Sequence, residues 1–211
     1  MSKLVILVSG GGSNLQSILD AVATGKIQAQ VAAVIADRDC YGLERARKAG
    51  VPAYLIDRKL HRSDLSEEIA KLIPFDCDLI VLAGFLSILN VKFIQKWPNK
   101  IINIHPSLLP DFAGLNTHRR ALEAKHNWHG CSVHCVDAGV DTGALIAQAR
   151  IQITADDTKS TLEARVLEKE HIIYPWVVVQ IARKEITVHD GQISYTNACW
   201  QIARERDFLL A

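Results

Sequence analysis

The sequence predicts an α/β fold, an open, mostly parallel, twisted sheet with helices on both faces. In the first hundred residues, short β-branched and aliphatic runs alternate with segments of helical periodicity. The first run, residues 3–8 (KLVILV), is apolar after its lysine, which is typical of a parallel strand buried on both faces. The spacing between runs leaves room for right-handed helical crossovers, which parallel strands require.

The elements of the first half follow in order. The expected strands share continuous apolar character and cover residues 3–8, 31–36, 53–56, 79–83 and 101–104. The expected helices have apolar residues three or four positions apart and cover residues 15–24, 43–49 and 63–72. Gly25 and Gly50 follow the first two helices and suit their ends, and Ser63 is expected to cap the third.

The pattern changes after residue 130. Strands are expected at residues 132–136, 145–153, 186–188 and 192–195, and we expect them to extend the same sheet. A long helix is expected at residues 159–183, with Pro175 near a bend. The sequence shows no repeat, low-complexity stretch or linker, so we expect a single domain over residues 1–211.

Composition excludes several classes of protein. The chain has 211 residues, 49% of them hydrophobic, which is enough for a core and excludes a disordered chain. Lys and Arg number 24 against 23 Asp and Glu, so no basic excess indicates a nucleic-acid or membrane-surface binder. Five scattered cysteines predict reduced thiols in a cytoplasmic protein. No apolar run reaches transmembrane length, and the N-terminus fits a first strand better than a signal peptide.

A glycine-rich turn, residues 9–14 (SGGGSN), follows the first strand and opens a helix. Such a turn directs backbone N–H groups and the positive end of the helix dipole at an anion, usually a phosphate. It is no dinucleotide fingerprint, because Leu15 occupies the third glycine position, and no P-loop lysine follows. Two interpretations remain, phosphate binding and a tight turn without a ligand. Asp37 closes the second strand, where a ribose-binding acid would lie in a dinucleotide-binding domain. The alternative is an exposed acid at a strand end that only aids solubility.

Two polar side chains share one face of the fifth strand. Alternation places Asn103 and His105 on one face and Ile102 and Ile104 on the other. Pro106 ends the strand, so both polar groups lie near its carboxyl end, where open α/β sheets bind ligands. An Asn–His pair that only satisfies buried backbone groups is the alternative.

Residues 130–143 (GCSVHCVDAGVDTG) contain further polar groups. Cys131 and Cys135 alternate with Ser132 and His134 along a strand, so these groups do not converge on a metal, and we predict none. The following loop offers Asp141 as a carboxylate that supports a histidine. Glu170 and His171 lie within a helical pattern, where a solvated helix face is the ordinary interpretation.

Together these segments resemble the phosphoribosylglycinamide formyltransferase family, the folate-dependent enzymes of purine synthesis. The resemblance covers nearly the whole chain in family order. The matching segments are SGGGSNLQ (9–16), GLERARKAG (42–50), LAGFLSIL (82–89), INIHPSLLP (102–110), GLNTHRRALE (114–123), GCSVHCVDAGVDTG (130–143) and EHIIYP (170–175). It implies a formyltransferase-type fold with a Rossmann-like N-terminal half. The implied division is a phosphate-binding half at about residues 1–100, a catalytic and folate-binding half at about 101–195, and a tail of unknown role at 196–211.

The resemblance also implies site residues. The catalytic residues it implies are Asn103, His105 and Asp141. The ribonucleotide-binding residues it implies are Gly12, Ser13, Asn14 and Glu170. The folate-binding residues it implies are Arg62, Leu86, Ser87, Ile88, Leu89 and Asn103. The chain departs from the family at Ser87, where an arginine is common, at Ala113 and Asn116, and at Cys135, where an aromatic residue is usual.

The implied reaction moves a formyl group from 10-formyltetrahydrofolate, as co-substrate, to the amine of glycinamide ribonucleotide, without a metal. An asparagine amide and an imidazolium can both donate to the oxyanion of the tetrahedral intermediate. Asp141 would favour the charged imidazole, so we expect a raised pKa for His105. The expected partners are small-molecule substrates, with no nucleic acid or membrane, in a monomer or homodimer. The rival functions are formyltetrahydrofolate hydrolysis and a non-catalytic nucleotide-binding module.

Overall fold

The computed structural model describes residues 1–211. The chain forms two compact units, residues 1–103 and 104–211. The strands of the first unit all pair in parallel. In spatial order they are β3 (Ala53–Leu55), β2 (Ala29–Ala36), β1 (Ser2–Val8), β4 (Leu79–Leu82) and the beginning of β5 (Ile101–His105). The central strand β1 is the most deeply buried, because Leu4 to Val8 are at most 1% exposed. The continuous apolar run therefore forms the centre of the parallel sheet, as predicted.

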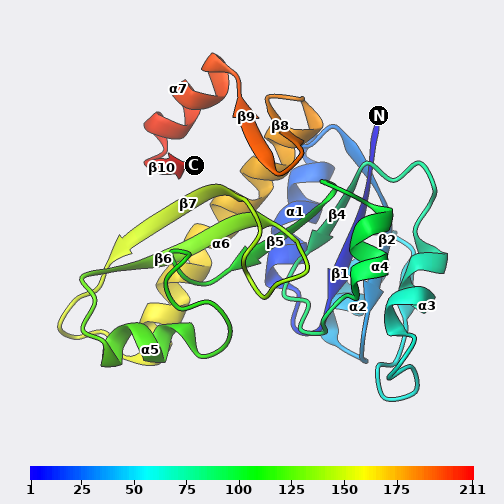
Figure 1. Cartoon of the computed structure of the whole chain (residues 1–211), viewed down its shortest axis with the longest axis horizontal. Coiled ribbons are helices and arrows are strands. Elements are labelled where there is room, and N and C mark those ends of the chain that lie inside the picture. Colours follow the sequence, from blue (N-terminus) through cyan, green and yellow to red (C-terminus); the bar gives the residue numbers. More distant parts are fainter. The chain divides into compact units, whose positions relative to one another are not determined.

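Four helices connect these strands. They are α1 (Ser13–Ala23), α2 (Tyr41–Lys48), α3 (Leu65–Leu72) and α4 (Val91–Lys96). The chain moves outward from β1 to β3 and then returns to β4 on the other side of β1. Right-handed crossovers therefore place α1 and α2 on one face and α3 and α4 on the opposite face. The contacts agree, since α1 lies against α2 and α3 against α4, and Figure 1 shows α3 and α4 beside one another. The prediction of helices on both faces is confirmed.

The reversal of strand order falls between β1 and β4. In open α/β sheets the carboxyl ends of the strands on either side of such a reversal form the ligand-binding crevice. The glycine-rich turn follows β1, and the segment 84–89 follows β4. Two hydrogen bonds join them, because the Ser9 N–H donates to the Gly84 carbonyl (3.0 Å) and the Leu86 N–H donates to Ser9 Oγ (2.8 Å).

The second unit continues from the end of β5 with antiparallel strands. Their order is β10 (Phe208–Leu210), β7 (Leu145–Gln152), β6 (Trp128–Cys135) and β5, and β7 runs antiparallel to both β6 and β10. The long helix α6 (Lys159–Ala182), yellow to orange in Figure 1, contacts β6, β7 and the short helix α5 (Thr117–Glu123). Pro175 lies within α6. The sheet is therefore mostly parallel, with an antiparallel part that comes from the C-terminal half.

Two sequence-based expectations are wrong. The strands β8 (Ile186–His189) and β9 (Gln192–Tyr195) do not extend the main sheet, because they pair with each other in a separate two-stranded sheet. The helix α7 (Asn197–Glu205) follows β9, and β10 then occupies the edge beside β7. Ser63 does not cap α3, which begins at Leu65 with Asp64 before it. No helix combines the length and the apolar character needed to cross a membrane.

Candidate active site

His105, the last residue of β5, lies beside the Asp141 carboxylate. Its Nδ1 is 3.2 Å from Asp141 Oδ2, and its Nε2 is 3.1 Å from the carbonyl oxygen of Phe112. Asp141 Oδ2 also accepts a hydrogen bond from the Gly114 N–H (2.9 Å). Both ring nitrogens of His105 therefore face acceptors, an arrangement that an imidazolium satisfies completely and a neutral imidazole satisfies only at one nitrogen.

Burial opposes the charged form of this histidine. His105 is 6% exposed, and burial lowers its pKa below the usual value, although the Asp141 charge and the Phe112 carbonyl act in the raising direction. The expectation of a raised pKa is therefore wrong, because loss of hydration outweighs the carboxylate. For Asp141, burial alone would raise the pKa, but the nearby His134 ring and the hydrogen bond from the Gly114 N–H hold it below the usual value.

His134 is a second histidine at the same carboxylate. Its Nε2 lies 3.6 Å from Asp141 Oδ1, and its Nδ1 faces the Cys135 carbonyl at 2.7 Å. On the same face of β6, Ser132 donates to the Ser107 carbonyl (2.6 Å). From the sequence, Ser132 and His134 are considered only as part of a metal site. They share one face of β6, where Ser132 supports the loop after His105 and His134 lies beside Asp141.

Asn103 lies two residues before His105 on β5, so its side chain projects from the same face of that strand. Its side chain is half-buried, between the buried Ile102 and Ile104. The polar atoms of Asn103 and His105 thus reach the same side of one strand near its carboxyl end. This is the arrangement that the sequence alternation predicts.

The glycine-rich turn leads directly into α1. Gly12 occupies the N-cap position with a left-handed backbone (φ 70°), and Ser13 and Asn14 are the first two residues of the helix. A glycine offers no side chain to cap the helix, so the N-terminal N–H groups of α1 receive no side-chain cap from it. These N–H groups and the helix dipole favour an anion at this position.

Helix α2 holds the turn in place. Arg45 Nε donates to the Gly11 carbonyl (2.7 Å), its Nη1 donates to Gln16 Oε1 (3.0 Å), and the Gly42 N–H donates to the Gly10 carbonyl (3.1 Å). A Cβ atom added at Gly12 would lie 2.9 Å from the Cα of Gly42. No local signal in the sequence indicates that Gly42 and Arg45 hold the turn, since about thirty residues separate them from it.

Along the segment expected to bind folate, residues 86–89, exposed side chains alternate with buried or half-buried ones. Leu86 and Ile88 are 63% and 81% exposed, whereas Leu89 is buried and Ser87 is half-buried. The Ser87 hydroxyl donates to the buried carboxylate of Asp37. Arg62 is exposed, in the turn that precedes α3. The structure thus joins Ser87 to the first unit's interior and leaves Arg62 on its surface.

Glu170 is buried in α6, at 6% exposure, so the interpretation as a solvated helix face is wrong for this residue. Burial, and then the nearby charge of Glu170, raise the pKa of the Cys131 thiol. Burial also raises the pKa of Cys135 to about 11. Both thiols therefore stay protonated near neutral pH, which makes them poor nucleophiles and poor metal ligands.

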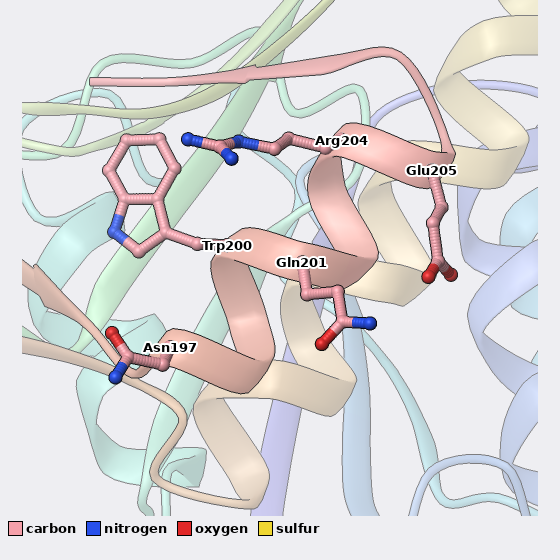
Figure 2. Close-up of a pocket in the computed structure, with 5 residues that line it drawn as sticks. All are labelled: Asn197, Trp200, Gln201, Arg204 and Glu205. Carbon is pink, nitrogen blue, oxygen red and sulfur yellow. The ribbon is translucent and has the colours of Figure 1, made fainter.

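Two other surface features lie apart from these residues. Side chains of His61, Asp64 and Glu68 come close enough to share a cation, but Glu68 already pairs with Lys71 (2.5 Å). A hollow of about 640 Å³ lies over α7, where Trp200 and Arg204 project one helical turn apart (Figure 2). The residues that line it are Asn197, Trp200, Gln201, Arg204 and Glu205. None of them is a predicted site residue, and they offer no buried acid–base pair.

Comparison with known proteins identifies a family for this chain. Residues 2–178 match the formyl transferase family model. The phosphoribosylglycinamide formyltransferases of Haemophilus influenzae and Escherichia coli are 44% and 41% identical, covering 90% and 94% of this chain and 92% of each relative. The solved structure of phosphoribosylglycinamide formyltransferase from Coxiella burnetii has a TM-score of 0.87 and 43% identity, covering 92% of this chain and 93% of that one. With an Asn–His strand and a carboxylate beside the histidine in a fold of this kind, the chain belongs to the formyl transferase family.

Proposed function

We propose that this protein transfers the formyl group of 10-formyltetrahydrofolate to the amine of glycinamide ribonucleotide, which gives formylglycinamide ribonucleotide in purine biosynthesis. The observation that carries this proposal is the buried His105–Asp141 pair, 3.2 Å apart, on the strand that bears Asn103. The names of the two bacterial relatives support phosphoribosylglycinamide as the acceptor and formyl as the group transferred.

The reaction needs no protein nucleophile. The substrate amine attacks the formyl carbon, and a tetrahedral intermediate forms that carries an oxyanion. In our proposal the Asn103 amide and the His105 imidazolium donate hydrogen bonds to that oxygen. The carbon–nitrogen bond to N10 of the folate then breaks, and His105 donates a proton to the departing nitrogen as a general acid. The attacking nitrogen loses one proton, which returns His105 to its charged form, so the product is a neutral formamide and the folate carries N10–H.

His105 is suited to this proton transfer because opposing effects act on its pKa. Burial lowers its pKa, which makes the imidazolium a stronger acid, while Asp141 and the Phe112 carbonyl keep the charged form accessible. To reach the substrate, Nε2 exchanges the Phe112 carbonyl for the reacting oxygen or nitrogen. Asp141 keeps its place at Nδ1 and fixes the ring during that exchange.

The remaining predicted residues bind substrates. In our proposal Gly12, Ser13 and Asn14 bind the 5′-phosphate through backbone N–H groups at the start of α1, and Glu170 binds another part of the ribonucleotide. The segment Leu86, Ser87, Ile88 and Leu89 binds the pterin through its backbone, and Arg62 contacts a carboxylate of the folate. Phosphate binding fixes the amine for attack, so binding energy from a remote group lowers the barrier.

An assay of formyl release with and without glycinamide ribonucleotide tests the proposal directly. We expect formylglycinamide ribonucleotide and free tetrahydrofolate in equal amounts, and no release of formate when the ribonucleotide is omitted. Formate release that does not depend on the ribonucleotide would instead identify a formyltetrahydrofolate hydrolase. Binding of a nicotinamide dinucleotide without formyl transfer would identify a nucleotide-binding module.

The pKa of His105 provides a test of its pairing. In Asp141→Asn we expect the already lowered pKa to fall further, because the change removes the raising effect of the carboxylate. The imidazolium is lost as pH rises through the pKa, so the mutant loses its acid function at a lower pH than the wild type. An NMR titration of His105 measures this shift, and Asp156→Asn, an exposed carboxylate, is the matched control. An unchanged pKa in Asp141→Asn would contradict the pairing.

Chelation provides a test of the metal-free mechanism. We expect full activity after exhaustive treatment with EDTA, because every proposed step uses an amide, an imidazole or a backbone N–H group. The thiols of Cys131 and Cys135 stay protonated, and Glu68 is paired with Lys71. Loss of activity that a single kind of metal ion restores would overturn this mechanism.

We also propose that the chain acts as one formyltransferase domain, as a monomer or homodimer, and that it works in the cytoplasm. All five cysteines are free thiols, which supports a reducing compartment. The ratio of molar mass in solution to 23.3 kDa measures the oligomeric state.

A further inference from the structure

Asp37, the residue directly after β2, is a charged side chain with no exposed surface. A buried carboxylate is costly unless it is paired and hydrogen-bonded. Arg38 donates to both of its oxygens at 3.1 Å, and Arg58 Nη1 lies 3.7 Å from Oδ2. Burial alone would raise the pKa of Asp37, but hydrogen bonds from Arg38, Ser87 and Ser9 hold it below the usual value. The carboxylate is therefore charged at neutral pH.

Two of these donors belong to segments that we assign to substrate binding. Ser87 is the middle residue of the proposed folate-binding segment, and Ser9 begins the glycine-rich turn. Ser9 Oγ also accepts the Leu86 N–H at 2.8 Å. The carboxylate thus holds Ser87 directly, and the hydrogen bond from the Leu86 N–H joins the same segment to Ser9 in the glycine-rich turn.

The segment itself contains no helix or strand after β4 ends at Leu82. The conformation of the segment depends on every second side chain, which points inward. Phe85 and Leu89 are buried apolar anchors, and Ser87 between them is a polar anchor, whereas Leu86 and Ile88 project outward. Without the polar anchor, the centre of the segment would lose the contact that fixes the direction of its backbone N–H and carbonyl groups.

From this geometry we propose that Asp37 is a positioning residue, which holds residues 85–89 in the folate-binding conformation through the Ser87 hydroxyl. The proposal rests on the proposed function only for the identity of the ligand. In this proposal Asp37 acts through this hydroxyl and does not contact folate. The Ser87 side chain points toward the interior, and in this proposal the backbone of residues 85–89 faces folate.

Backbone order is measured without any substrate. In Ser87→Ala and in Asp37→Asn we expect amide hydrogen exchange of Leu86 to accelerate by about tenfold, the scale of one lost hydrogen bond to a charged group. Ser87→Thr keeps a hydroxyl and should restore slow exchange. Asp39→Asn removes an exposed carboxylate two residues from Asp37 and should leave the exchange rate unchanged.

Ligand binding is measured separately, by titration with 10-formyltetrahydrofolate in the absence of ribonucleotide. We expect the folate dissociation constant to rise by about tenfold in Ser87→Ala and Asp37→Asn and to recover in Ser87→Thr. At saturating folate, kcat should stay within about threefold of the wild type, because no reacting group is changed. A purely structural role would lower the urea midpoint of unfolding without this selective effect on folate binding.

The two proposals fail in different ways. If the wild type binds folate but transfers no formyl group, the proposed function is wrong, and the exchange and binding measurements still decide the role of Asp37. If Ser87→Ala folds, and its Leu86 exchange and its folate dissociation constant both match the wild type, Asp37 does not position the segment. Should Asp37→Asn fail to fold, the comparison of Ser87→Ala with Ser87→Thr decides alone.

Discussion

Asn103→Ala is expected to lower kcat by on the order of 10²–10³, the range for loss of one oxyanion donor. The side chain projects from the same face of β5 as His105, where the oxyanion forms in our proposal. That negative charge is absent from both bound substrates. Interactions that exist only in the transition state appear in kcat, so the dissociation constants of both substrates should change much less.

Single-turnover formyl transfer and direct binding measurements separate these effects. Asn103→Asp should be no better than Asn103→Ala, because a carboxylate repels the oxyanion. Asn127→Ala changes an exposed asparagine outside the site and should keep the wild-type rate. A near wild-type single-turnover rate in Asn103→Ala would show that this face of β5 does not stabilise the oxyanion.

The first half of the fold was predictable because its signals are local. The run KLVILV is apolar at every position after its lysine, and it forms the buried central strand β1. The alternation of Asn103 and His105 with Ile102 and Ile104 likewise needs only the geometry of one strand. Both inferences depend on neighbouring residues and on no contact between distant segments.

The C-terminal elements were less predictable because their partners are distant. Residues 186–195 carry strand patterns, but nothing local shows that β8 and β9 pair with each other instead of with the main sheet. The edge strand is the three-residue β10, Phe208–Leu210, which is too short to give a periodic signal.

The electrostatics of the site also depend on distant contacts. His105 and Asp141 were placed together by resemblance, but the direction of the pKa shift depends on burial, which the sequence does not give. The Asp37–Ser87 hydrogen bond joins residues fifty positions apart. In the sequence, Asp37 is the acid that closes the second strand and Ser87 is a departure from the family, and only the fold shows that the two side chains meet.

Gly12→Val is expected to raise the KM for the ribonucleotide by on the order of 10²–10³ and to leave the KM for folate almost unchanged. Gly12 has a left-handed backbone (φ 70°), and a Cβ atom there would approach the Cα of Gly42 to 2.9 Å. The side chain of valine therefore forces the turn away from α2 and misdirects its N–H groups. Two lost hydrogen bonds to a phosphate, at about 1.5–2 kcal/mol each, the lower part of the range for bonds to a charged group, account for that factor.

A matched variant at the other end of α1 separates ligand binding from backbone strain. Gly25 has nearly the same backbone conformation (φ 71°), but a Cβ atom there meets nothing within 4 Å. Gly25→Val should therefore lower the urea midpoint of unfolding and leave both KM values unchanged. Gly12→Ala is the milder variant if Gly12→Val does not fold, because it brings the same Cβ with less bulk. Equal increases in both KM values, in either Gly12 variant, would mean that the phosphate does not bind at this turn.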